Sequence, residues 1–368
     1  MATSGRPLIT ANQVTLLRIA LLPVPCALIL YGPLSWQWFA IGLYVALGFT
    51  DLLDGWMARH WGGTVLGALL DPVADKVFMA AALIPMSALH FVHPAVVVVI
   101  LIREFLITSL RSAMSVRGKH VKTSILAKLK TSVQMGGSFV VYVVYRLPAK
   151  DEALIALGGV SVVAAAILVW RYLATRRFNP LVVVPCCLVL FACLVRAVVA
   201  ADVASHVYWA VIVLFTVGSA VDYLGGAWTV LAKGAGHHLN DLGRILWSIA
   251  GGCGIPLLVA WRPEISPIGV VLLSTELATG AVDNLRCHES FLPHWWIFPL
   301  RAVALGAGGW LVLSLAHDGT AWSPAFWAAT GLAFLLFLWT LLDFIVARHL
   351  IWGTDAPPAD EAKGSMGR

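Results

Sequence analysis

Apolar stretches about as long as a bilayer is thick recur along almost the whole chain. Of its 368 residues, 60% are hydrophobic and only 12% are charged, whereas about 25% of the residues in a soluble domain are charged. A helix needs roughly 20 mostly apolar residues to cross the hydrocarbon core. We therefore predict an all-α, polytopic membrane bundle of about twelve spans. They lie near residues 13–31, 36–53, 72–92, 94–114, 126–147, 153–173, 180–199, 206–224, 243–261, 266–285, 295–315 and 325–347.

Lysine and arginine divide unevenly between the two sets of loops. One set carries Arg59, Arg117, Lys119, Lys122, Arg176, Arg177, Lys233, Arg244 and Arg286, and the other mainly Arg146, Lys150 and Arg262. Loops rich in Lys and Arg stay in the cytoplasm, so we expect both chain ends and the acidic segment 51–75 on the cytoplasmic side. The net charge of +6 then reflects topology. Because no basic domain is present, nucleic acid is not expected as a partner.

Four aspartates stand beside these apolar stretches. Asp51 and Asp54 are three residues apart, and Asp71 and Asp75 are four apart, so on helices each pair projects from one face. Carboxylates at membrane depth are costly and usually functional, and oxygen-rich sites suit hard cations such as Mg²⁺. We predict a divalent metal site at these four residues. The alternative is a solvated loop that holds the acids in salt bridges.

Small residues and one arginine flank the first pair of aspartates. Gly55 and Ala58 have almost no side chain, which lets a ligand lie against the helix backbone. Arg59 offers a planar, permanently charged fork for a phosphate. Since Mg²⁺ held by carboxylates often also binds substrate phosphate oxygens, this segment predicts phosphoryl transfer.

A second group of charged residues is basic. Arg103 and Arg111 are eight residues apart, slightly more than two helical turns, so they face roughly the same side. Together with Arg18, Lys128 and Lys130, they predict a pocket for the phosphate of an acceptor substrate. The alternative is that these side chains snorkel to the headgroup level.

The acidic segment resembles the signature of the CDP-alcohol phosphatidyltransferases. It reads Asp51-x2-Asp54-Gly55-x2-Ala58-Arg59 and then Gly67-x3-Asp71-x3-Asp75. The seven residues from His60 to Leu66 separate the arginine from Gly67, where the family usually has eight. The shortening falls in the loop that joins the two helices, so each aspartate pair keeps its own helical phase.

Further segments are similar to members of this family that make phosphatidylglycerophosphate. They are Ala11 to Arg18 followed by Pro23, Arg103 to Arg111, and Ala127 to Met135. Ala11 and Ala127 replace a proline and a glycine of those enzymes. A weaker similarity, Ser219 to Leu224, to the family's last helix implies a catalytic region 1–233, with an inserted helical hairpin at about 150–200.

The resemblance implies transfer of a phosphatidyl group from CDP-diacylglycerol to sn-glycerol 3-phosphate, with release of CMP. One or two Mg²⁺ or Mn²⁺ ions at the four aspartates would clamp the pyrophosphate, and Asp75 would also serve as the base for the acceptor hydroxyl. Gly55, Ala58, Arg59 and Gly67 would bind the CDP-alcohol. The resemblance also implies a bacterial inner-membrane protein with a cytoplasmic active site, and a homodimer as a further expectation.

Two alternative functions stay open from the sequence. Another family member would use inositol phosphate, serine or a phospholipid as the acceptor, and a membrane transporter would use intramembrane acids to bind coupling ions. Residues 234–352 resemble no known segment and are expected to form an accessory transmembrane region, whose charged residues pair with each other or face the cytoplasm. The polar, Pro/Gly-rich residues 353–368 predict a disordered cytoplasmic tail.

Overall fold

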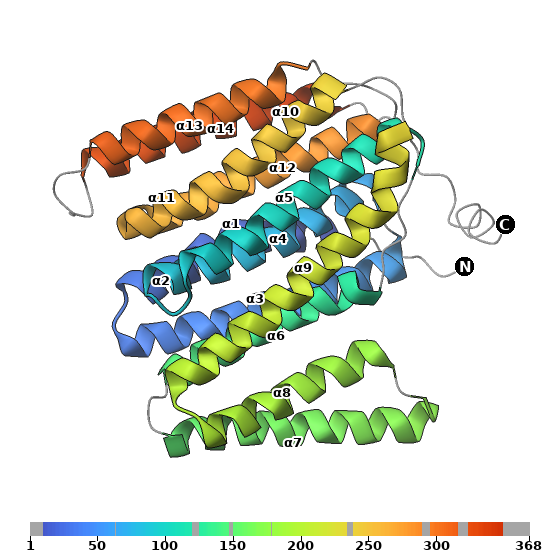
Figure 1. Cartoon of the computed structure of the whole chain (residues 1–368), viewed down its shortest axis with the longest axis vertical. Helices are drawn as coiled ribbons and strands as arrows, with labels where there is room; N and C mark the ends of the chain where they lie inside the picture. The colour runs from blue at the N-terminus through green and yellow to red at the C-terminus, as the bar shows by residue number, and fades with distance from the viewer. Residues whose placement is uncertain are drawn as a thin grey trace.

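The computed structural model is a bundle of helices (Figure 1). It describes residues 10–62, 64–119, 125–146, 150–177, 179–233, 238–288, 295–315 and 323–348. No strand occurs among these residues, which confirms the all-α prediction. The proposed tail 353–368 lies outside the described residues.

The helices follow one another with short connections. In chain order they are α1 (Ala11–Leu21), α2 (Pro23–Tyr31), α3 (Leu34–Trp61), α4 (Val65–Ala88), α5 (Pro94–Val116), α6 (Ile125–Arg146), α7 (Lys150–Thr175), α8 (Pro180–Val198), α9 (Ala201–Lys233), α10 (His238–Ile249), the π-helical η1 (Ala250–Gly254), α11 (Ile255–Trp261), the 3-10 turn η2 (Pro263–Ile265), α12 (Ser266–His288), α13 (Ile297–Ser314) and α14 (Pro324–Val346).

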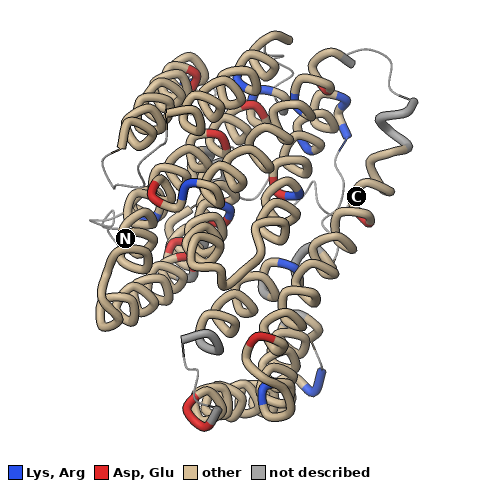
Figure 2. The backbone as a smooth tube through the Cα atoms, turned by 60° about the vertical axis from the view of Figure 1, so that its left-hand side comes forward, with Lys and Arg blue, Asp and Glu red and all other residues tan. Residues whose placement is uncertain are grey.

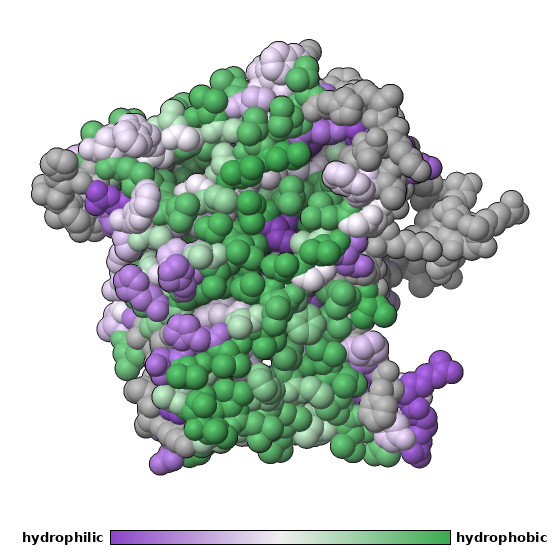
Figure 3. Space-filling model, in the orientation of Figure 1, coloured by the Kyte–Doolittle hydropathy of each residue, from purple (hydrophilic) through white to green (hydrophobic). Residues whose placement is uncertain are grey.

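The chain is a multi-pass membrane protein. Among the described residues, eight helical stretches are long and apolar enough to cross a membrane. The other four predicted spans coincide with α4, α5, α6 and α8. The first three carry the charged residues of the motifs, and the apolar part of α8 is shorter. Figure 3 shows a broad apolar band across the face in view, with hydrophilic side chains mostly near its left and right edges.

Local hydrogen bonds fix where the aspartate-bearing helices begin and end. Helix α3 ends at Trp61, and Gly62 follows with φ +96°, a backbone conformation that favours glycine. Thr64 then caps α4, since its hydroxyl accepts a hydrogen bond from the Gly67 N–H at 2.9 Å. Helix α3 thus ends at Trp61 and α4 begins at Val65, so both aspartate pairs lie inside regular helices.

Helix α5 lies in the middle of the bundle. It packs against α9 on one side and against α10, η1 and α12 on the other, as Figure 1 shows. Helices α7 and α8 pack on each other and reach the rest of the bundle mainly through α6 and α9. They form an outer hairpin at the bottom of Figure 1. Helix α12 covers α4 and α5, so the region after residue 233 packs directly on helices that carry the predicted site.

A buried ion pair holds part of this later region together. Arg301 Nη2 donates to Glu276 Oε1 at 2.7 Å, and Trp247 Nε1 donates to Oε2 of the same carboxylate at 2.5 Å. Both charged side chains are completely buried. A buried charge is tolerated when it is paired and hydrogen-bonded.

Glu276→Ala should therefore destabilise the protein strongly. It leaves Arg301 buried without its carboxylate, which costs about 3–5 kcal/mol. We expect a clear drop in the thermal unfolding temperature of the purified protein in detergent. Glu152→Ala on the exposed first turn of α7 is the control, and equal unfolding temperatures for the two variants would contradict the structural role of the pair.

Candidate active site

The first pair of aspartates is held by helix α1. Arg18 Nη1 donates to Asp51 Oδ1 at 2.6 Å, and its Nη2 lies 3.6 Å from Asp54 Oδ2. Thr15 Oγ1 donates to the same Asp54 oxygen at 2.8 Å. Asp54 is buried, whereas Asp51 is partly exposed. Helix α1 thus supplies one positive charge and one hydroxyl donor to the acidic group.

The second pair of aspartates lies on α4, close to the first. The charges of Asp71 and Asp75 both interact with those of Asp51, Asp54 and Arg18. Asp71 is exposed and Asp75 is partly buried. The four carboxylates therefore share one electrostatic environment, and we call them the acidic cluster.

The negative charge of the acidic cluster suits a divalent cation, but its carboxylate oxygens do not converge on one point. Among the described side chains, four carboxylates face the positive charge of Arg18, and carboxylate oxygens are the ligands that Mg²⁺ prefers. Within the described parts of the chain, however, no three or more His, Cys, Asp or Glu side chains are grouped closely enough to hold an ion. The predicted cage is not closed, because Asp51 and Asp54 turn toward Arg18 and Thr15. Ion binding at these residues would require their side chains to rotate.

The residues predicted to bind the CDP-alcohol lie next to the acidic cluster. Gly55 and Ala58 are partly exposed on α3, and the side chain of Arg59 lies outside the described atoms. Gly67 begins α4 beside α1: a Cβ there would lie 2.9 Å from Asn12 Oδ1 and 3.2 Å from the Thr64 hydroxyl. Glycine at this position allows α1 and α4 to approach closely.

A second cluster, of opposite charge, forms between α4, α5 and α6. Lys130 Nζ donates to Glu104, and Arg103 Nη1 donates to the same carboxylate at 3.2 Å. Lys76 Nζ donates to Thr108 on α5. The charge of Arg111 interacts with those of Lys76 and Lys130.

We call Lys76, Arg103, Arg111 and Lys130 the basic cluster. Among the described side chains, its four cations face one nearby carboxylate, Glu104, so positive charge is in excess there. Figure 2 shows charged segments of both signs on neighbouring helices amid long uncharged stretches. The cluster contains three of the predicted acceptor residues.

Two of the predicted acceptor residues are not placed in the basic cluster. The side chain of Lys128 lies outside the described atoms. Arg18 pairs with Asp51 and Asp54 instead, because α1 packs against α3 and α4. In this arrangement Arg18 serves the acidic cluster.

Some members of the site were not predicted from the sequence. Lys76 was missed although it directly follows Asp75, and a lysine within an apolar span is a signal by itself. Helix α9 also contributes: Arg103 Nη2 donates to Ser219 Oγ at 3.1 Å, and the Arg111 guanidinium lies 5.8 Å from the centre of the Tyr223 ring. These contacts join residues more than a hundred positions apart, which no local pattern reveals.

Comparison with known proteins agrees with the geometry. The sequence profile described as CDP-alcohol phosphatidyltransferase matches residues 8–175. A protein of Bacillus subtilis named CDP-diacylglycerol–glycerol-3-phosphate 3-phosphatidyltransferase is 34% identical over 138 residues, which cover 34% of this chain and 71% of the relative. This chain belongs to the CDP-alcohol phosphatidyltransferase family. It is therefore a transferase enzyme of phospholipid synthesis.

Two further relatives carry the same name as the Bacillus subtilis protein. The Escherichia coli protein is 38% identical to this family member over 130 residues, 33% of this chain and 69% of the relative. The Cereibacter sphaeroides protein is 34% identical over 129 residues, 34% of this chain and 58% of that relative's length. No solved structure matches the chain.

The family match has a clear end within the fold. Residues 8–175 include the acidic cluster and all four cations of the basic cluster. They end with α7, before α9 and before the region after residue 233. The contacts of Ser219 and Tyr223 therefore come from a helix outside the matched segment.

Proposed function

We propose that this enzyme transfers a phosphatidyl group from CDP-diacylglycerol to sn-glycerol 3-phosphate and releases CMP. The observation that carries the proposal is the buried basic cluster beside the acidic cluster. The two meet on α4, where Asp75 belongs to one and Lys76 to the other. One site can thus bind a nucleotide pyrophosphate and, next to it, the phosphate of a second substrate.

The acidic cluster is the proposed donor site. Asp51, Asp54, Asp71 and Asp75 would hold one or two Mg²⁺ or Mn²⁺ ions, which when bound neutralise charge on the pyrophosphate as its bond breaks. The small side chains of Gly55 and Ala58 leave room for the donor along α3. Arg18, paired with Asp51 and Asp54, reduces the repulsion between carboxylates.

The basic cluster is the proposed acceptor site. The phosphate of glycerol 3-phosphate carries close to two negative charges, and the excess cations around Glu104 can balance them by charge-assisted hydrogen bonds. With its phosphate held there, the acceptor hydroxyl lies on the side of α4 that carries Asp75. Asp75 takes the hydroxyl proton, the hydroxyl oxygen forms a bond to the lipid-side phosphorus, and CMP leaves with the electron pair of the broken P–O bond.

The positive charge of the basic cluster favours acceptors that carry a phosphate. Inositol phosphate would satisfy the same cations, whereas serine brings no phosphate to them. The names of the relatives favour glycerol 3-phosphate over inositol phosphate. The uneven distribution of Lys and Arg supports a site that opens to the cytoplasm, and the bacterial relatives support a bacterial inner membrane.

The choice of acceptor can be tested directly. Membranes that contain the protein are given CDP-diacylglycerol, Mg²⁺ and one acceptor at a time, and release of CMP is measured. We expect turnover with glycerol 3-phosphate and none with serine. Membranes from the same cells without the protein are the control. Turnover with serine or inositol phosphate alone would show that the proposed acceptor is wrong.

A further inference from the structure

Helix α5 carries two different faces. One holds Arg103 and Glu104 in the basic cluster. The other carries Phe105 and Ser109, which are four residues apart and so form one stripe. This stripe leads to Arg117, eight residues after Ser109 and directly after the last residue of α5. This second stripe faces α10 and, at Phe105, η1, in the region that has no counterpart in the family match. The helix that presents the acceptor cations is thus held from behind by that region.

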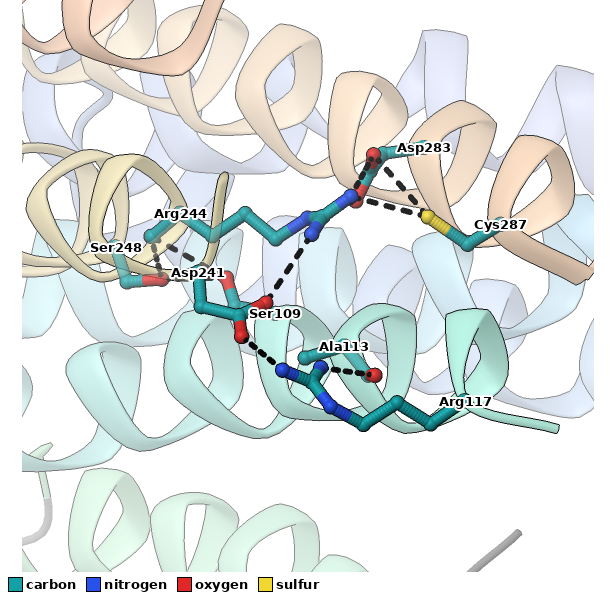
Figure 4. A network of polar contacts seen from close by, with 8 residues as sticks. All are labelled: Ser109, Ala113, Arg117, Asp241, Arg244, Ser248, Asp283 and Cys287. Carbon is teal, nitrogen blue, oxygen red and sulfur yellow. Dashed lines mark hydrogen bonds and ion pairs between the residues drawn. The ribbon is translucent and has the colours of Figure 1, made fainter. Parts of the chain in front are cut away.

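Ion pairs connect the end of this second stripe to α10 and α12, as Figure 4 shows. Arg117 Nη2 donates to Asp241 Oδ2 on α10 at 2.7 Å. Arg244, one turn further along α10, lies 3.5 Å from the other Asp241 oxygen. Its Nε and Nη2 donate to the two oxygens of Asp283 on α12 at 2.8 and 2.9 Å. The chain of contacts therefore runs from α5 through α10 to α12.

Among the described side chains, this network pairs charges of opposite sign, which distinguishes it from the basic cluster. Two arginines, Arg117 and Arg244, meet two aspartates, Asp241 and Asp283. Arg244 is almost completely buried, and buried paired charges fix geometry because leaving either partner alone is costly. Such a network is suited to locking helices in place rather than to binding an ionic ligand.

The backbones of α5 and η1 touch directly. A Cβ on Gly252 would lie 2.6 Å from Ile102 Cα and 2.9 Å from its nitrogen. A Cβ on Gly251 would lie 2.9 Å from the Phe105 ring. Backbone atoms cannot move aside as a side chain can, so even a methyl group at Gly252 must push α5 away. Ile102 directly precedes Arg103, so the displacement would reach the basic cluster.

We propose that α10, η1 and α12 position α5 for binding of the acceptor, with Asp241 and Gly252 as positioning residues. This inference rests on the proposed function, because it assigns the acceptor site to the front face of α5. Helices outside the family match then act on the reaction without touching either substrate. The effect of Asp241 and Gly252 is expected on acceptor binding, since both residues contact α5, whereas the donor site lies on α3 and α4.

Asp241→Asn tests the ionic part of the proposal. It removes the charge that pairs with Arg117, and we expect the KM for glycerol 3-phosphate to rise about tenfold, the size of a lost charged hydrogen bond. The KM for CDP-diacylglycerol should stay unchanged, and Asp241→Glu should restore most of the loss. The matched control is Asp343→Asn on α14, which breaks a similar partly buried pair with Arg286 and lies on a helix that packs on α12 and α13.

Gly252→Ala tests the steric part. We expect the same selective rise in the acceptor KM, because the methyl group meets the backbone of Ile102. Gly308→Ala is the matched control: its Cβ would lie 2.6 Å from Leu332 Cδ2, a flexible side chain between α13 and α14. Thermal unfolding of all five variants shows that each is folded.

A selective rise in the acceptor KM for Asp241→Asn and Gly252→Ala, and not for the controls, supports the proposal. Equal effects of the two Asp→Asn variants, or parallel rises in both substrate KM values, would overturn it. The wild type shows whether the proposed function itself fails. If it turns over only with another acceptor, the proposed acceptor is wrong, and the KM values of the variants are then compared for that other acceptor. Glycerol 3-phosphate should also raise the unfolding temperature of the protein, which measures acceptor binding without turnover. Asp241→Asn and Gly252→Ala should need a higher concentration of it than the wild type for the same rise.

Discussion

Asp75→Asn should lower the turnover of CDP-diacylglycerol by about a thousandfold, the range that a positioned general base contributes. The substitution keeps the shape of the side chain but removes the negative charge, the proton acceptor and one proposed metal ligand. It should not unfold the protein, because Asp75 stands among other carboxylates and loss of one charge relieves their repulsion. Release of CMP by the purified variant measures the effect.

The matched control is Asp151→Asn, at the exposed start of α7. It makes the same chemical change far from both clusters, so its turnover should equal that of the wild type. A folded Asp75→Asn variant that keeps most of its turnover would show that neither base nor metal ligand is needed at this position.

Lys130→Gln should raise the KM for glycerol 3-phosphate about a hundredfold and leave the KM for CDP-diacylglycerol unchanged. Loss of a charged hydrogen bond costs up to about 3 kcal/mol, which corresponds to roughly a hundredfold in affinity. Arg103 still pairs with Glu104 in the variant, so the carboxylate keeps one partner. Initial rates measured against each substrate in turn give both constants.

An exposed cation serves as the comparison. Arg171→Gln on α7 removes the same charge from the outer hairpin and should leave both KM values as they are. If Lys130→Gln changed the donor KM as much as the acceptor KM, the basic cluster would not be a separate acceptor site.

The sequence predicted the elements of this fold because apolar length and helical phase are local properties. Each predicted span coincides with a helix or with consecutive helices, such as α1 and α2, which separate at Pro23. The same reasoning placed Asp51 with Asp54 and Arg103 with Arg111 on shared faces. It could not say which helix each face meets.

Contacts between residues that are distant along the chain could not be predicted from the sequence. Arg18 is a cation like Arg103, and only the packing of α1 on α3 shows that it serves the acidic cluster. Ser219 lies 116 positions from Arg103. In the sequence, α6, α7 and α8 come between their helices. The charged residues of the later region were expected to pair or to face the cytoplasm; Arg286 does pair with Asp343, on a different helix.

Anomalous scattering from Mn²⁺ in crystals grown with CDP-diacylglycerol tests most directly whether the four aspartates hold the donor. We predict one or two manganese peaks within bonding distance of Asp51, Asp54, Asp71 and Asp75, beside the pyrophosphate. The carboxylates of Asp51 and Asp54 should turn from Arg18 toward the metal. A bound nucleotide with no manganese at these residues, or with manganese elsewhere, would contradict the assignment of the acidic cluster.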